Sequence, residues 1–200
     1  MQNNIYLALG VRKDVVADWW HAIRAGATVS EVRAFRRECL EPSWLKVFGK
    51  DLGIGREEDF RYYVKAREAG ATHAEIMEVV THGAHVASYS AIRGAGATHA
   101  EAMEAVLHRV SGMAYAEAGE AGATHAEIME AARRGPFVNE YSALRCNGIG
   151  HTEGMEAMCL TATVQTYLAA REAGATHAEV MSASRVPGSL LNNLRTLLRR

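Results

Sequence analysis

The chain has 200 residues, of which 48% are hydrophobic, and 22 basic and 23 acidic side chains give a net charge of −1. The apolar content is ample for a folded core, and the balanced charge gives no indication of a nucleic-acid or membrane partner. The three cysteines are an odd number without metal-ligand spacing, so we expect reduced thiols in a cytoplasmic protein.

The first residues contain no basic start followed by a long apolar run, so no signal peptide is expected. No stretch approaches the ~20 consecutive apolar residues of a membrane span.

Residues 1–50 form a predicted N-terminal cap with one copy of a motif, Ala-Gly-Ala-Thr, that recurs along the chain. A helix is expected to start at Thr28 and to run through Phe35. Large aromatic side chains either seal the end of the helical core, which we favour, or form an exposed docking patch. These residues are Trp19, Trp20, Trp44 and Phe48.

Residues 51–185 form a predicted tandem repeat, because the motif Ala-Gly-Ala-Thr-His-Ala-Glu recurs at a fixed interval. Copies begin at 69, 95, 121, 147 and 173, each 26 residues after the last, and the copy at 147 is damaged. A fixed period of this length is typical of stacked repeats that bury each other's apolar faces.

Each unit is predicted to contain two short helices, A and B, that are too short to be stable alone. The motif glycine ends helix B in the left-handed conformation, the threonine caps helix A, and the glutamate completes a capping box. Gly150 replaces the threonine in the fourth unit. The expected boxes are Thr28–Glu31, Thr72–Glu75, Thr98–Glu101, Thr124–Glu127 and Thr176–Glu179.

Apolar residues at helical spacing predict the core. Helix A is expected to bury Ile76, Met77 and Val80 in one unit and Met103, Val106 and Leu107 in the next. Helix B is expected to bury Val86, Tyr89 and Ile92, then Val138, Tyr141 and Leu144. A tyrosine precedes every motif copy by six residues, and the methionine row is also assigned to the core.

One repeat position is always histidine: His73, His99, His125, His151 and His177. Stacked helices lie ~8–10 Å apart, whereas imidazole nitrogens bind zinc at ~2.0–2.1 Å, so successive histidines cannot share an ion. We expect structural or surface roles for them, with no metal site and no cofactor. Rows of glutamate after methionine and of arginine at the end of helix B predict ion pairs between units.

The sequence contains no GxSxG, HExxH or Walker motif, so no enzymatic activity is expected. Residues 186–200 are predicted to form a C-terminal capping helix with a leucine stripe and terminal arginines.

These features predict an all-α solenoid of about six short helix-turn-helix repeats with divergent caps. It is similar in plan to TPR, HEAT and armadillo arrays, although its unit is shorter. The AGATHAE wording also resembles short-repeat hypothetical proteins of actinobacteria and their phages. That resemblance implies the repeat fold and no particular activity.

Repeat solenoids offer an extended surface to a partner, so the first hypothesis is a non-enzymatic protein-binding scaffold or inhibitor. The A–B connection and the start of helix B differ most between units. The predicted partner-binding residues there are His82, His85, His108, Arg133, Arg134, Asn139 and Gln165.

Two alternatives stay open. The spacing of Ala66, Gly70 and Ile76 resembles that of DNA-binding helix-turn-helix units, although Glu75 and Glu78 on helix A oppose contact with phosphate. Nucleic acid would then meet the basic ends, at Arg33, Arg36, Arg37, Arg195, Arg199 and Arg200. The third hypothesis is a structural subunit of a larger assembly, such as a virion.

Overall fold

A computed structural model describes residues 13–40, 56–135, 138–160 and 163–184, and within them the chain forms α-helices and no strands. The predicted all-α repeat fold is confirmed. The expected C-terminal capping helix lies outside the described residues. The helices are α2 (Lys13–Arg24), α3 (Val29–Leu40), α5 (Arg56–Glu68), α6 (His73–Thr81), α7 (Val86–Gly94), α8 (His99–Leu107), α9 (Gly112–Glu120), α10 (His125–Arg133), α11 (Val138–Cys146), α12 (His151–Met158), α13 (Val164–Glu172) and α14 (His177–Ser184).

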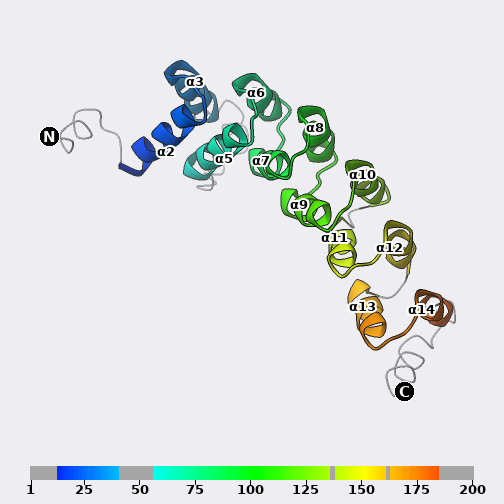
Figure 1. Cartoon of the computed structure of the whole chain (residues 1–200). Helices are drawn as coiled ribbons and strands as arrows, with labels where there is room; N and C mark the ends of the chain where they lie inside the picture. Colours follow the sequence, from blue (N-terminus) through cyan, green and yellow to red (C-terminus); the bar gives the residue numbers. More distant parts are fainter. Residues whose placement is uncertain (1–12, 41–55, 136–137, 161–162, 185–200) are drawn as a thin grey trace, which may run out of the picture. The chain divides into compact units, whose positions relative to one another are not determined.

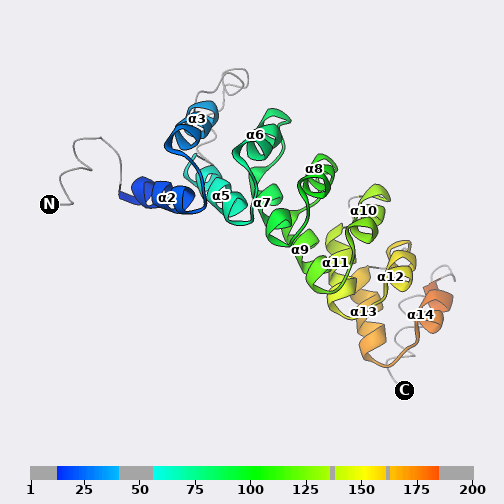
Figure 2. The ribbon, with the colours of Figure 1, turned by 45° about the horizontal axis from the view of Figure 1, so that its top comes forward.

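The chain divides into two compact units, Met1–Gly112 and Met113–Arg200. In the first unit α2, α5 and α7 pack in one row, and α3, α6 and α8 lie in a second row (Figures 1 and 2). In the second unit α11 packs against α13 in the row of B helices, while α10, α12 and α14 form the row of A helices. Each unit is therefore a two-layer stack of short helices.

The two helices of a unit follow one plan, which the sequence analysis missed. The helices from α6 to α14 are eight or nine residues long, and each of them after α6 begins 13 residues after the preceding one. The 26-residue period is thus two equal halves of one helix and one turn each.

The same turn closes both halves in the first unit. After α7, Gly96 N–H donates to the Arg93 carbonyl and Ala97 N–H to the Ile92 carbonyl. After α6, Gly83 N–H donates to the carbonyl of residue 80 and the next N–H to that of residue 79. This pair of bonds is the Schellman motif, which needs a left-handed residue. Gly83 and Gly96 supply it, with φ of +66° and +90°.

Arg109 occupies this left-handed position after α8, with φ of 59°. Its N–H and that of Val110 make the same two Schellman bonds, to residues 106 and 105. An L-residue is strained in this conformation because its Cβ crowds the carbonyl oxygen. The bonds of the turn therefore hold Arg109 in a geometry that favours glycine.

The core follows the predicted pattern on helix B and shifts slightly on helix A. Val86, Tyr89 and Ile92 are buried as expected, as is the equivalent set on α11. On α6 the buried residues are Ile76 and Val79, so the stripe is displaced from the predicted Met77 and Val80, which are half-buried.

Leu107 is 54% exposed, so its assignment to the core was wrong. It is the last residue of α8, and its side chain faces solvent at the end of the helix. Met103 and Val106 are buried as predicted. The methionine row is buried at Met103, Met129 and Met155 and half-buried at its two ends.

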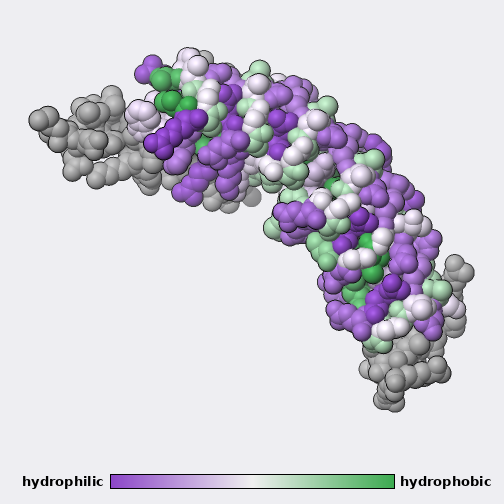
Figure 3. All heavy atoms as spheres, in the orientation of Figure 1, coloured by the Kyte–Doolittle hydropathy of each residue, from purple (hydrophilic) through white to green (hydrophobic). Residues whose placement is uncertain are grey.

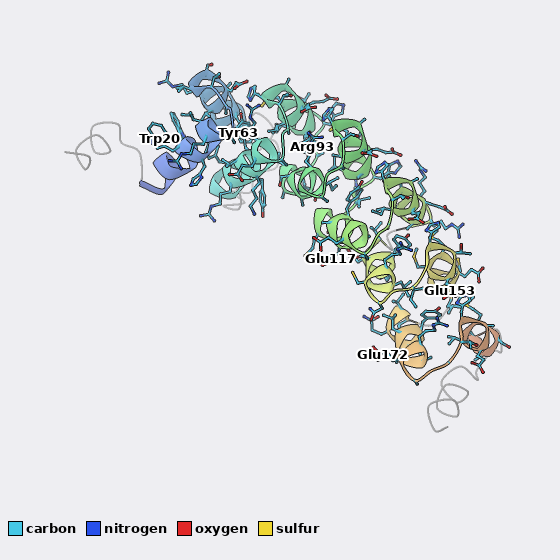
Figure 4. The ribbon with its side chains drawn as sticks, viewed as in Figure 1. Trp20, Tyr63, Arg93, Glu117, Glu153 and Glu172 are labelled. Carbon is cyan, nitrogen blue, oxygen red and sulfur yellow. The ribbon has the colours of Figure 1, made fainter. Side chains whose placement is uncertain are left out.

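An aromatic cluster joins the first helices. The rings of Phe35 and Tyr63 lie 4.4 Å apart, and those of Phe60 and Tyr63 lie 5.8 Å apart and are stacked. Trp20 is 61% exposed and projects from α2, so the expectation that it seals the core was wrong (Figure 4). Trp44 and Phe48 lie outside the described residues.

Replacing Arg109 by glycine should stabilise the protein. The change removes the left-handed strain, and we expect a gain of about 0.5–1 kcal/mol after the greater freedom of glycine in the unfolded chain is deducted. The measurement is the urea midpoint followed by circular dichroism.

Gly83→Ala is the matched control at the same repeat position. A Cβ at Gly83 meets no atom within 4 Å, so only the backbone is strained, and the midpoint should fall. Equal midpoints for both variants and the parent would contradict this account of the turn.

Candidate functional site

The predicted capping boxes are present in the structure. Glu127 N–H donates to Thr124 Oγ1 at 3.3 Å, and Thr124 N–H donates to Glu127 Oε2 at 2.8 Å. Thr28, Thr72, Thr98 and Thr176 make the same reciprocal bonds with their glutamates. Gly150, as expected, caps α12 without a side-chain bond.

Capping lowers the pKa of two of these carboxyls, Glu31 and Glu127. The backbone N–H of Thr28 lowers the pKa of Glu31, and that of Thr124 lowers the pKa of Glu127, below the ordinary value of 4.5. Burial opposes the shift in both groups without reversing it. A carboxylate that accepts a backbone N–H is favoured in its charged form.

Each repeat tyrosine bonds the histidine that begins the next A helix, ten residues later. Tyr hydroxyl and His Nδ1 are 3.2 Å apart in the first pair and 2.9 Å apart in the other four. The pairs are Tyr63–His73, Tyr89–His99, Tyr115–His125, Tyr141–His151 and Tyr167–His177.

The other ring nitrogen reaches back to the preceding A helix. His99 Nε2 lies 3.2 Å from Glu78 Oε2 in the first unit. In the second unit His151 Nε2 lies 3.2 Å from Glu130 Oε2, and the equivalent pair at His177 is 2.9 Å apart. We call each chain of three side chains a Glu–His–Tyr bridge. It links two successive A helices through the B helix between them.

The carboxylate fixes the tautomer of the neutral histidine. A carboxylate can only accept a hydrogen bond, so His151 Nε2 carries the hydrogen atom, and its N–H donates a hydrogen bond to Glu130. Nδ1 then accepts from the Tyr141 hydroxyl. Every side-chain polar atom of the bridge at His151 has a partner, because Arg134 bonds the second oxygen of Glu130. Complete bridges account for His99, His151 and His177.

The bridge is structural in its chemistry. The side chains of Tyr89 and Tyr141 are fully buried, and burial raises the pKa of each hydroxyl to about 12. A hydroxyl that stays protonated and shielded from solvent is a donor and a poor nucleophile.

The arginines that end helix B mainly bond the turn that follows. Arg93 lies between α7 and α8 and donates to the Ala97 carbonyl at 2.9 Å (Figure 4). Arg171 lies within 3.5 Å of Glu153, on the side of α12 towards α13 (Figure 4). Arg171 therefore pairs with a glutamate of its own repeat unit, and Arg93 bonds its own turn. The predicted ion pairs with the glutamates after methionine are not found at these two arginines, since glutamates such as Glu130 bond histidines instead.

All seven predicted partner-binding residues are exposed. His82, His85 and His108 are in the first unit, and the other four are in the second. His82 Nδ1 lies 2.9 Å from the Glu78 carbonyl, and Arg134 pairs with Glu130 at 3.0 Å. These two side chains have local partners on their own helices.

The structure brings Asn139 and Gln165 together at one cleft. The cleft has a volume of about 370 Å³ and lies where α11, the end of α12 and the start of α13 meet. Figure 3 shows hydrophobic surface in this part of the second unit, with hydrophilic residues around it. This cleft could not be predicted from the sequence, because its lining comes from three helices and the connection between two of them.

The arginines of the nucleic-acid hypothesis are only partly described. Arg33 is exposed on α3, and Arg36 and Arg37 lie in the same helix. The three C-terminal arginines lie outside the described residues.

Among the described residues, no three His, Cys, Asp or Glu side chains are grouped so that they could hold a metal ion. No described helix combines the length and apolar character that crossing a bilayer requires.

Comparison with known proteins adds no relative. No protein-family model, no curated protein and no solved structure matches this chain. Fold and site together define an all-α protein of tandem helical repeats.

Removing one hydroxyl should expose the contribution of the bridge. Tyr141→Phe leaves His151 Nδ1 without its donor, and we expect a loss of about 1–2 kcal/mol and faster hydrogen exchange in α11 and α12. Tyr62→Phe is the control, since this half-buried ring makes a cation–π contact with Lys65 outside any bridge. Similar exchange rates in the two variants would show that the bridge adds nothing.

Acid should weaken the capped helices. Because folding lowers the carboxyl pKa, the unfolded chain binds more protons between the folded pKa and 4.5, and stability falls as pH drops through this range. Glu127→Gln should flatten the decline of the urea midpoint, whereas Glu120→Gln, an exposed change outside any capping box, should not. A slope unchanged by Glu127→Gln would refute the assignment.

Proposed function

We propose that the chain is a non-enzymatic protein-binding scaffold. The observation that carries the proposal is a difference between the constant and the variable positions of the repeat. Residues that recur in the units, such as Tyr141 and His151, form the bridges and turns inside the stack. The seven predicted partner-binding residues, which differ between units at the A–B connection and the start of helix B, are exposed. A constant frame with a varied surface is what repeat proteins use to recognise partners.

The variation is chemical as well as positional. The first residue after the start of helix B is Ala87 in α7, Met113 in α9, Asn139 in α11 and Gln165 in α13. Met113, Asn139 and Gln165 are exposed, and Met113 is among the most exposed apolar side chains described. None of these changes is needed to stack helices, so partner recognition is the physical role we assign to them.

Photo-crosslinking from this surface tests the proposal. A benzoylphenylalanine placed at Gln165 in the full chain, in cells of its source, should give one discrete protein adduct. Asn139→Ala should weaken that adduct, because Asn139 lines the same cleft. The control position is Ala178, an exposed residue of α14.

Two results would overturn the scaffold proposal. One is the absence of any adduct from Gln165 and the other exposed connection positions. The other is an identical set of adducts from Ala178, since this would indicate collision without recognition.

A further inference from the structure

We propose that the cleft between α11, α12 and α13 binds an arginine or lysine side chain in an extended segment of the partner. The inference rests on the proposed scaffold function and adds the chemistry of what this site recognises.

The floor of the cleft suits an aliphatic stem. It is formed by Ala143, Ala157, Met158, Leu160 and Val164. Arginine and lysine bury their methylene groups along such surfaces while the charged head seeks a polar partner. A volume of about 370 Å³ is within the range of ligand sites and exceeds what one side chain needs, so part of the main chain also fits.

Glu140 supplies the partner for the charged head. It lines the cleft, and its Oε2 atom is buried and makes no hydrogen bond with any described residue. The residue as a whole is half-buried, so a guanidinium or ammonium group in the cleft can make a charge-assisted bond with its carboxylate.

Positive charges on the flanking helices are committed elsewhere. Arg145 on α11 donates to the Ile149 carbonyl, and Arg171 on α13 pairs with Glu153. Arg134, at the end of α10, pairs with Glu130. Glu172 projects from α13 on the side away from α14 (Figure 4). These three arginines therefore have partners outside the cleft.

Two amides are placed to hold the main chain. Asn139 and Gln165 occupy the same repeat position on neighbouring B helices and line the cleft. Neighbouring helix axes lie ~8–10 Å apart, which is the length of roughly three residues of extended chain at ~3.3 Å each. Each amide can donate and accept, so it can pair with a peptide unit on either side of the inserted side chain.

The first unit provides an internal comparison. A cleft of about 470 Å³ lies between α5 and α7, where Ala87 stands at the amide position and Lys65 lines the rim. Ser88 occupies the position of Glu140. This cleft has no amide and no carboxylate at the Glu140 position, and its own carboxylate, Glu68, shares the lining with the cation of Lys65. We therefore assign basic-peptide recognition to the cleft of the second unit.

The test uses two capped pentapeptides, Ala-Ala-Arg-Ala-Ala and the same peptide with citrulline in place of arginine. Citrulline keeps the shape and removes the charge. Titrated into the isotopically labelled full chain, the arginine peptide should shift the side-chain amide signals of Asn139 and Gln165. The citrulline peptide should bind at least about tenfold more weakly, since a hydrogen bond to a charged group contributes that much.

Glu140→Gln should reproduce the citrulline effect, with the fold checked by its urea midpoint. Glu120→Gln, which changes an exposed glutamate of α9 outside the cleft, should bind the arginine peptide as the parent does. Equal binding of both peptides to the parent chain, or no shift of the two amide signals at millimolar peptide, would overturn the inference. If Gln165 still crosslinks one protein, only the basic-peptide chemistry fails; if it does not, the scaffold proposal fails as well.

Discussion

A helix of eight or nine residues is marginal in water, because its few internal hydrogen bonds do not offset the entropy lost on ordering it. The caps, the turns and the bonds between helices all offset this cost. Capping boxes satisfy the first N–H groups, and Schellman turns satisfy the last carbonyls. Glu–His–Tyr bridges join α6 to α8, α10 to α12 and α12 to α14, each through a buried tyrosine. A helix of this length in the array would not be stable without its neighbours.

Local chemistry was predictable from sequence, whereas contacts between units were not. The threonine–glutamate spacing predicts the capping boxes because both partners lie within four residues. The partner of His151 lies 21 residues away on another helix, so only packing brings Glu130 to it. The 13-residue half-unit was missed because Gly70, Gly83 and Gly96 keep that interval while Arg109 breaks it.

The candidate surface shows the same division. Exposure of Asn139 and Gln165 followed from their variation between units, since positions inside a repeat frame cannot vary freely. The cleft beside them did not follow, because it depends on how Leu160, in the connection after α12, and Val164, on α13, meet α11. Periodicity indicates which side chains face outward; the spacing of the helices decides where they leave room.

The equality of the two half-units has a consequence for how the array can change length. A single helix with its turn is the repeating shape, yet histidine and its glutamate stand on alternate helices. A loss or gain of 13 residues would place a B helix, which begins at Val86 in one unit, where the A helix beginning at His99 now lies. Glu78 would then lose the histidine that it bonds. A loss or gain of 26 residues would leave every bridge complete. We therefore expect the array to change length by one pair of helices at a time.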